Sequence, residues 1–260
     1  MPRLMDNDDS MQQHNLAGNF SFSGKRLDKL GASEYTLATI AVDETGSTRG
    51  FEPIFHKMLV TAVAACKKSP RSDNLLLRVI YFSSRYQNGV KEIHGFKPLA
   101  EIDPASYPVP DGGGMTPLCD AVYSSIGAMN KYGEELFEQE YSANGIGFII
   151  SDGGENQSVA TMSMVKKEQT LSISGEKLES MVTVLIGINT APASDKIYSA
   201  QVADDLEKFR EESGMTQFID AGDATPAKLA KLAAFIDQSI SSQSQALGTG
   251  GPSQNIPLTI

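Results

Sequence analysis

Residues Leu37–Phe51 read LATIAVDETGSTRGF, an apolar run that stops at an aspartate. Up to Val42 the run is continuously apolar or β-branched, as in strands that are buried on both faces of a parallel sheet. Asp43 ends the run, and Thr45 and Ser47 follow it at alternate positions. We therefore predict a buried parallel strand whose carboxyl end presents one carboxylate and two hydroxyls.

The rest of the chain alternates similar apolar runs with helical patterns. Further strands are expected, the last of them weaker, at residues 75–82, 146–150, 182–188 and 217–219. Apolar residues at helical spacing predict helices within residues 51–66, 118–129 and 229–240. This alternation predicts a doubly wound α/β fold, with a mostly parallel sheet and helices on both faces. The segment 90–102 is expected to add one antiparallel edge strand.

The composition narrows the classes of partner. A hydrophobic content of 40% over 260 residues supports a full core, and the formal charge is -10 without any Lys/Arg cluster. We therefore expect no nucleic acid partner. The start of the chain lacks the apolar core of a secretory signal, and no stretch approaches the roughly 20 apolar residues of a membrane span. These features predict no membrane partner and a cytoplasmic location, and Cys66 and Cys119 are expected to be buried thiols.

One central domain with an extension at each end is expected. Residues 1–34 are polar, and the alternating piece Asn19–Ser23 could add an edge strand. Residues 35–240 hold the strand and helix patterns and form the domain. Residues 241–260 are rich in Ser, Gln, Gly and Pro, which predicts a flexible tail. Its apolar end, Ile256–Ile260, is expected to be mobile or held in a groove.

Three polar clusters follow the predicted strands or precede a helix. Asp43, Thr45 and Ser47 form the first, and a glycine-rich GGGMTPL stretch that contains Thr116 forms the second. The third is an SDG turn that contains Asp152. Because ligands bind beyond the carboxyl ends of parallel strands, we expect these clusters to lie together. Two carboxylates and three hydroxyls are oxygen donors of the kind that Mg²⁺ prefers.

Together these residues resemble the metal-ion-dependent adhesion site (MIDAS) of von Willebrand factor type A (VWA) domains, which is written D-x-S-x-S, T and D in that family. The resemblance covers residues 35–240 and departs from the pattern only in a threonine for the first serine. It implies that Thr45, Ser47 and Thr116 supply hydroxyl ligands. It also implies that Asp43 and Asp152 anchor Mg²⁺ or Mn²⁺, directly or through water.

The resemblance further implies what the chain does. VWA domains share the doubly wound fold and bind partners through a metal rather than catalyse reactions. We therefore expect an intracellular, non-enzymatic module that docks an Asp or Glu of a partner protein through a divalent cation. Glu44, Asp120 and Glu155 are expected on the same rim, where they would repel that carboxylate until the cation is bound.

Other interpretations remain open at this point. Each cluster alone is ordinary cap or turn chemistry. A phosphotransferase of the haloacid-dehalogenase type would use Asp43 as nucleophile, but the general acid expected two residues later is replaced by Thr45. The GGGMT stretch lacks the GK[ST] ending of a nucleotide-binding loop. A metal-free scaffold with the same fold is the third alternative.

Overall fold

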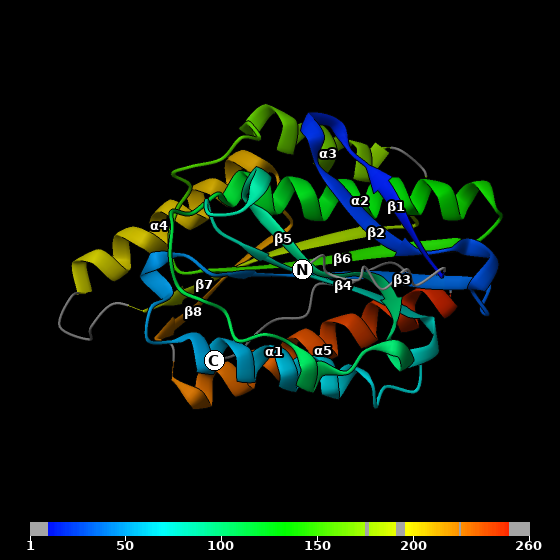
Figure 1. Ribbon diagram of the computed structural model, residues 1–260, viewed down its shortest axis with the longest axis horizontal. Helices are drawn as coiled ribbons and strands as arrows, with labels where there is room; N and C mark the ends of the chain where they lie inside the picture. Colours follow the sequence, from blue (N-terminus) through cyan, green and yellow to red (C-terminus); the bar gives the residue numbers. More distant parts are fainter. Residues whose placement is uncertain (1–9, 175–176, 191–195, 224, 250–260) are drawn as a thin grey trace, which may run out of the picture.

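The computed structural model describes residues 10–174, 177–190, 196–223 and 225–249. An eight-stranded sheet in the order β1-β2-β5-β4-β3-β6-β7-β8 lies at the centre (Figure 1). The strands are β1 (Met11–Asn15), β2 (Ser21–Lys25), β3 (Glu34–Asp43), β4 (Leu75–Phe82), β5 (Val90–Pro98), β6 (Ser142–Ser151), β7 (Met181–Asn189) and β8 (Gln217–Asp223). The helices are α1 (Glu52–Cys66), α2 (Leu118–Glu138), α3 (Met162–Ser174), α4 (Lys196–Ser213) and α5 (Pro226–Thr249).

The directions of the strands confirm the predicted α/β class. β4, β3, β6, β7 and β8 run parallel to one another, and β5 is antiparallel to β4. β5 is the antiparallel strand expected within residues 90–102, but it does not form the edge. The hairpin of β1 and β2 extends the sheet beyond it, through the pair Gly24 and Phe96. The polar extension at the start of the chain therefore supplies two strands.

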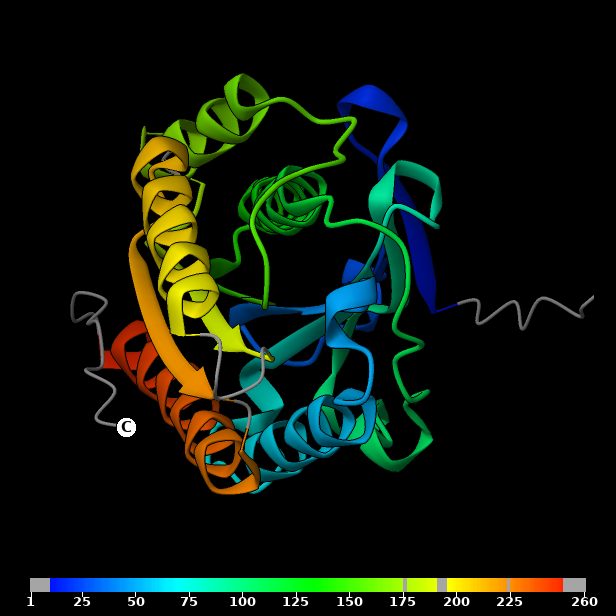
Figure 2. The same ribbon diagram turned by 90° about the vertical axis from the view of Figure 1, so that its left-hand side faces the viewer.

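Helices cover both faces of the sheet, and this explains the continuous apolar run in β3. Ile40 and Val42 pack on one side with residues of α1 and α5. Ala41 points to the other side and packs with residues of α2, α3 and α4. Figure 2 shows α1 and α5 on one side of the sheet and α2, α3 and α4 on the other. Successive side chains of a strand alternate between faces, so both sets of positions must be apolar.

The last helix continues beyond the point where the flexible tail was expected to begin. α5 passes Ser241 and ends at Thr249. Gln243 and Ser244 are buried in this last part, and the Gln243 carbonyl accepts a hydrogen bond of 2.8 Å from Asn144 Nδ2. These contacts hold polar residues in a helix that their composition alone does not predict. The apolar end Ile256–Ile260 lies outside the described residues.

Cys66 and Cys119 are both free and buried, as expected. Among the described residues, no helix combines the length and apolar character that crossing a bilayer requires.

Candidate metal centre

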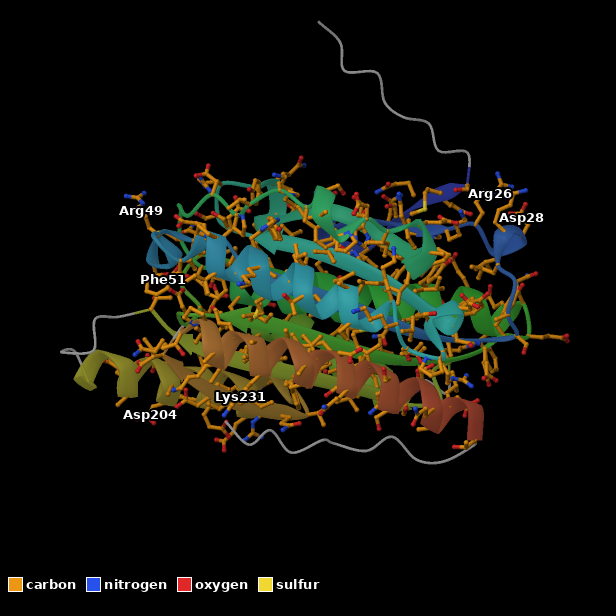
Figure 3. The ribbon with its side chains drawn as sticks, turned by 90° about the horizontal axis from the view of Figure 1, so that it is seen from below. Arg26, Asp28, Arg49, Phe51, Asp204 and Lys231 are labelled. Atoms are coloured by element: carbon orange, nitrogen blue, oxygen red, sulfur yellow. The ribbon has the colours of Figure 1, made fainter. Side chains whose placement is uncertain are left out.

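The three polar clusters meet at one end of the sheet. Asp43 is the last residue of β3, and Asp152 directly follows β6, which is the neighbour of β3. The glycine-rich stretch leads into α2 next to them. Figure 3 shows the loop after β3, marked by Arg49 and Phe51, at the opposite end of the molecule from Arg26 and Asp28. The parallel topology therefore gathers residues that are far apart in the sequence.

The loop after β3 is built around the Asp43 carboxylate, which is fully buried. Its Oδ1 accepts a hydrogen bond of 2.8 Å from the Thr45 amide, and its Oδ2 accepts one of 2.6 Å from Ser151 Oγ. Thr48 Oγ1 donates to the Thr45 carbonyl at 2.8 Å and closes the turn. Asp43 thus fixes the loop that carries Thr45 and also ties it to the end of β6.

Hydroxyl groups connect this loop to Asp152. Thr45 Oγ1 and Ser47 Oγ lie 3.0 Å apart, and Ser47 Oγ donates to Asp152 Oδ1 at 2.7 Å. Thr190, the residue after β7, donates to Asp152 Oδ2 at 2.5 Å. Thr45 and Asp152 are buried, whereas Ser47 is exposed. The site therefore lies just beneath the surface and opens to solvent at Ser47.

Thr116 lies beside the turn that carries Asp152. A Cβ atom added to Gly153 would be 3.6 Å from Thr116 Oγ1. The Thr116 amide donates to Asn156 Oδ1 at 2.7 Å, and the Asn156 amide donates to the Thr116 carbonyl at 3.1 Å. All five residues expected at the site, namely Asp43, Thr45, Ser47, Thr116 and Asp152, thus come from three loops that are in contact with one another.

The two carboxylates are costly to hold as anions without a cation. Burial and, after it, the charge of Asp152 raise the pKa of Asp43 from 3.8 to about 7. Burial also raises the pKa of Asp152, against the hydrogen bonds from Ser47 and Thr190. Low dielectric disfavours the charged form of a carboxylate, and a nearby like charge disfavours it further. A divalent cation would offset both effects.

The donor set fits a hard divalent cation. It consists of carboxylate and hydroxyl oxygens, which suit Mg²⁺ or Mn²⁺, and has no thiolate or imidazole. The part of the chain that the structure describes contains no group of three or more His, Cys, Asp or Glu residues that could hold a metal. The candidate centre would therefore depend on its hydroxyls as much as on its two carboxylates.

Two of the three acidic residues expected on the rim are not on the surface. Asp120 is buried and accepts hydrogen bonds from the amides of Val159 and Ala160. Glu44 is also buried, with 2% of its surface exposed, and pairs with Arg85. The expectation that these two carboxylates lie on the exposed rim is therefore wrong, because both side chains make their contacts inside the protein.

Sequence reasoning missed the residues that orient the site. The SDG turn pattern marks Asp152 but not Ser151, whose hydroxyl holds Asp43. Thr190 follows β7, the strand next to β6, and its place at the end of a predicted strand is the signal that identifies it. Nothing in the sequence marks Asn156, because its contact with Thr116 depends on how the two loops pack.

Comparisons with known proteins support the fold. No protein-family model and no curated protein matches the sequence. The open conformation of the pilus adhesin SpaC from Lactobacillus rhamnosus GG is similar in structure, with a TM-score of 0.57 and 8% sequence identity. The match covers 89% of this chain and 34% of the adhesin. At this identity the likeness concerns the fold alone.

A mussel protein gives weaker matches. Proximal thread matrix protein 1 (PTMP1) from the mussel byssus is 16% identical with a TM-score of 0.45, over 80% of this chain and 46% of that protein. A second PTMP1 structure, described as having a zinc-occupied MIDAS motif, has a TM-score of 0.44, 16% identity, and coverage of 81% and 47%. The chain thus spans between about a third and a half of the proteins that it matches.

Proposed function

We propose that the chain is a VWA-like protein-binding module that docks an acidic residue of a partner protein through a divalent cation. Asp43, Thr45, Ser47, Thr116 and Asp152 would hold the cation, which is Mg²⁺ or Mn²⁺. The module acts by binding and catalyses no reaction. It works in the cytoplasm, which agrees with two free cysteines since reducing compartments keep thiols unpaired. An antibody against the chain should then find it in the cytoplasmic fraction of its cell.

One observation carries the proposal. Two buried carboxylates at the ends of neighbouring strands are linked by one chain of hydrogen bonds: Asp43 accepts from the Thr45 amide, Thr45 Oγ1 contacts Ser47 Oγ, and Ser47 Oγ donates to Asp152. Thr116 stands next to the Asp152 turn. Turn chemistry explains each loop separately, but it does not explain why five oxygen donors lie together at the carboxyl ends of neighbouring strands.

The residues of the site have distinct tasks in this proposal. Asp43 and Asp152 neutralise a doubly charged cation, and the three hydroxyls complete the set without adding charge. When bound, the cation supplies an electrophilic position for anionic oxygen, and a partner carboxylate is the natural occupant because hard cations prefer such donors. Ser47 is the exposed member of the set, so the partner would approach from its side.

The geometry of Asp43 argues against the phosphotransferase alternative. A nucleophilic carboxylate must reach the phosphorus atom of its substrate, but Asp43 is fully buried and both of its oxygens accept hydrogen bonds. The position of a general acid is taken by Thr45. We therefore expect no release of phosphate from small phosphoesters in the presence of Mg²⁺, and turnover that is lost in an Asp43→Asn variant would overturn this part of the proposal.

The metal site can be tested without a partner. Calorimetric titration with Mn²⁺ should show one site per chain, weakened at least about tenfold by Asp43→Ala and by Thr116→Ala, because removing a ligand or its anchor lowers affinity by about that factor. Asp73→Asn is the matched control, since it removes one carboxylate from the opposite end of the sheet. The same Mn²⁺ affinity in all four proteins would contradict the assignment and favour a metal-free scaffold.

Docking can be tested with a displayed library of random peptides. Peptides captured in millimolar Mg²⁺ and released by EDTA should share an Asp or Glu, and changing that residue to Asn or Gln should abolish binding. Thr116→Ala should abolish the binding of the same peptides. Captured peptides that stay bound in EDTA, or that have no carboxylate in common, would show that docking does not use the cation.

A further inference from the structure

Glu44, the residue after Asp43, occupies a junction between three loops. Its side chain is buried, and its Oε1 accepts hydrogen bonds from Tyr86 Oη at 2.7 Å and from the Asp111 amide at 3.0 Å. Arg85 Nη2 lies 3.4 Å from the same oxygen. Tyr86 and Arg85 follow β4, and Asp111 directly precedes the glycine-rich stretch. One carboxylate oxygen therefore joins the loops after β3 and β4 to the loop that leads to Thr116.

The backbone of Glu44 strengthens this junction. Its amide donates to the Phe82 carbonyl at 3.1 Å, and its carbonyl accepts from the Gly113 amide at 3.0 Å. The Gly46 amide then donates to the Gly114 carbonyl at 2.9 Å. The glycine-rich stretch thus runs along the loop that carries the first two hydroxyls of the site, and it is held there at both backbone and side-chain level.

The glycines permit this close approach. A Cβ atom on Gly113 would lie 2.9 Å from Arg85 Nη1. The backbone of Gly114 has a φ of +81°, a conformation that residues other than glycine rarely adopt. Arg85 in turn donates to the side chain of Asp111 at 3.1 Å and also to its backbone carbonyl. The stretch is therefore packed against the Glu44 junction and cannot shift without breaking it.

We infer that Glu44 is a positioning residue that sets the cation affinity of the proposed site by fixing the glycine-rich stretch, and through it Thr116, against the Asp43 loop. Thr116 lies two residues beyond Gly114, and its amide donates to Asn156 Oδ1. The intervening Met115 donates to Ser84 Oγ at 2.9 Å and accepts from the Ser84 amide at 3.0 Å. Loss of the Glu44 junction would remove the anchor of the stretch to the Asp43 loop and leave Thr116 held by Asn156 and by the Met115 contacts. The inference rests on the proposed function, because it concerns the affinity of the same site.

A set of variants separates positioning from simple charge. Glu44→Ala removes the acceptor, whereas Glu44→Gln keeps a carbonyl oxygen that can accept from Tyr86 and Asp111. Glu52→Gln is the matched control: its Oε2 accepts the Gly50 amide at 2.7 Å at the same end of the molecule, and the change removes the same charge. Glu52 Oε1 lies beside Gly112, 2.9 Å from where a Cβ atom would be, and Gln keeps an oxygen or nitrogen atom of similar size there, so the hydrogen bonds of Glu44 stay in place. Tyr86→Phe removes one of the hydrogen bonds to Glu44 and leaves the backbone contacts in place.

Two measurements are made on each variant. Calorimetry with Mn²⁺ should show an affinity about tenfold lower for Glu44→Ala than for the parent. The affinity should stay within about threefold of the parent for Glu44→Gln, Tyr86→Phe and Glu52→Gln. The reason is that losing the whole hydrogen-bond network lowers stability more than losing one neutral hydrogen bond. Hydrogen exchange in EDTA should be at least about tenfold faster at the Gly46 and Gly113 amides of Glu44→Ala only.

Each outcome decides a different point. Equal losses of affinity in Glu44→Gln and Glu44→Ala, with Glu52→Gln unchanged, would overturn the inference in favour of a direct charge effect. Parent-like affinity in a folded Glu44→Ala protein would overturn it outright. If the parent protein binds no Mn²⁺, both the proposed function and the predicted effect on affinity are wrong. Unchanged hydrogen exchange in Glu44→Ala would show, independently of metal, that the junction does not hold the glycine-rich stretch in place.

Discussion

Changing Asp43 to Asn should remove much of the pH dependence of folding stability in the metal-free protein. The pKa of Asp43 is raised by burial and by the charge of Asp152, so the folded state binds a proton that the unfolded chain has already released. Stability is therefore highest at low pH and is lost as the pH rises towards 7. Asn can take over the contacts, because Ser151 Oγ is also within 2.9 Å of the Gly153 carbonyl and can donate there instead.

The size of the effect follows from the two pKa values. The pKa of Asp43 is about 7 in the folded state, and its ordinary value is 3.8. Because each pKa unit corresponds to about 1.4 kcal/mol, the unfolding free energy of the parent should fall by about 3 kcal/mol between pH 5 and pH 8. At a urea dependence of about 3 kcal/mol per molar, this corresponds to a midpoint shift of about 1 M. Saturating Mg²⁺ at pH 8 should restore a similar amount, about 2.7 kcal/mol at one hundred times its dissociation constant.

Urea denaturation in EDTA at pH 5 and pH 8 measures this directly. Asp120 and Asp237, whose pKa values are also raised, contribute equally to parent and variant, so the difference between the two proteins reports the buried pair of Asp43 and Asp152. Asp73→Asn should keep the pH dependence of the parent. If the parent is equally stable at both pH values, or if Asp43→Asn loses as much stability as the parent, the argument from the buried pair is refuted.

Two other predictions concern the framework. Gly114→Ala should lower the unfolding free energy measured in urea by about 1 to 3 kcal/mol, because a φ of +81° disfavours a residue with a side chain. Gly31 has open space around it, so Gly31→Ala should change the unfolding free energy by less than about 0.5 kcal/mol. Equal effects of the two changes would contradict the assigned conformation of Gly114. Deleting residues from Gln243 onward should lower the melting temperature by several degrees because Asn144 loses its acceptor, while truncation after Thr249 keeps α5 whole and is the control; equal melting temperatures would contradict this packing.

The sheet could be predicted because its signal is local. β3, β4, β6 and β7 are buried on both faces, so each of them reads as an apolar run. The weak run at residues 217–219 belongs to β8, the last strand of the sheet, which is only partly buried. Helix α3 gave no such signal. Its buried side chains include Val165, Gln169 and Ser172, which have helical spacing but are mostly polar. α4 buries Leu206 and Phe209, too few apolar residues to mark a helix face.

The site was predictable to the extent that it depends on strand ends. Asp43 and Asp152 could be placed together because adjacent parallel strands have their carboxyl ends on the same side of the sheet. Which carboxylates face the site could not be read from the sequence, since that depends on neighbours far along the chain. Asp120 is held by the amides of a distant loop, and Glu44 meets residues that follow another strand. Such contacts leave no periodic pattern.

The central claim is that one divalent cation is held between the loops after β3 and β6 and the loop before α2. Paramagnetic broadening of backbone amide signals by Mn²⁺ locates the cation in solution. We predict that substoichiometric Mn²⁺ broadens the amide signals of Thr45, Thr116 and Gly153 first, and that excess Mg²⁺ reverses this. Broadening centred on other acidic surfaces, such as Asp204, or the absence of any site that Mg²⁺ competes for, would contradict the account.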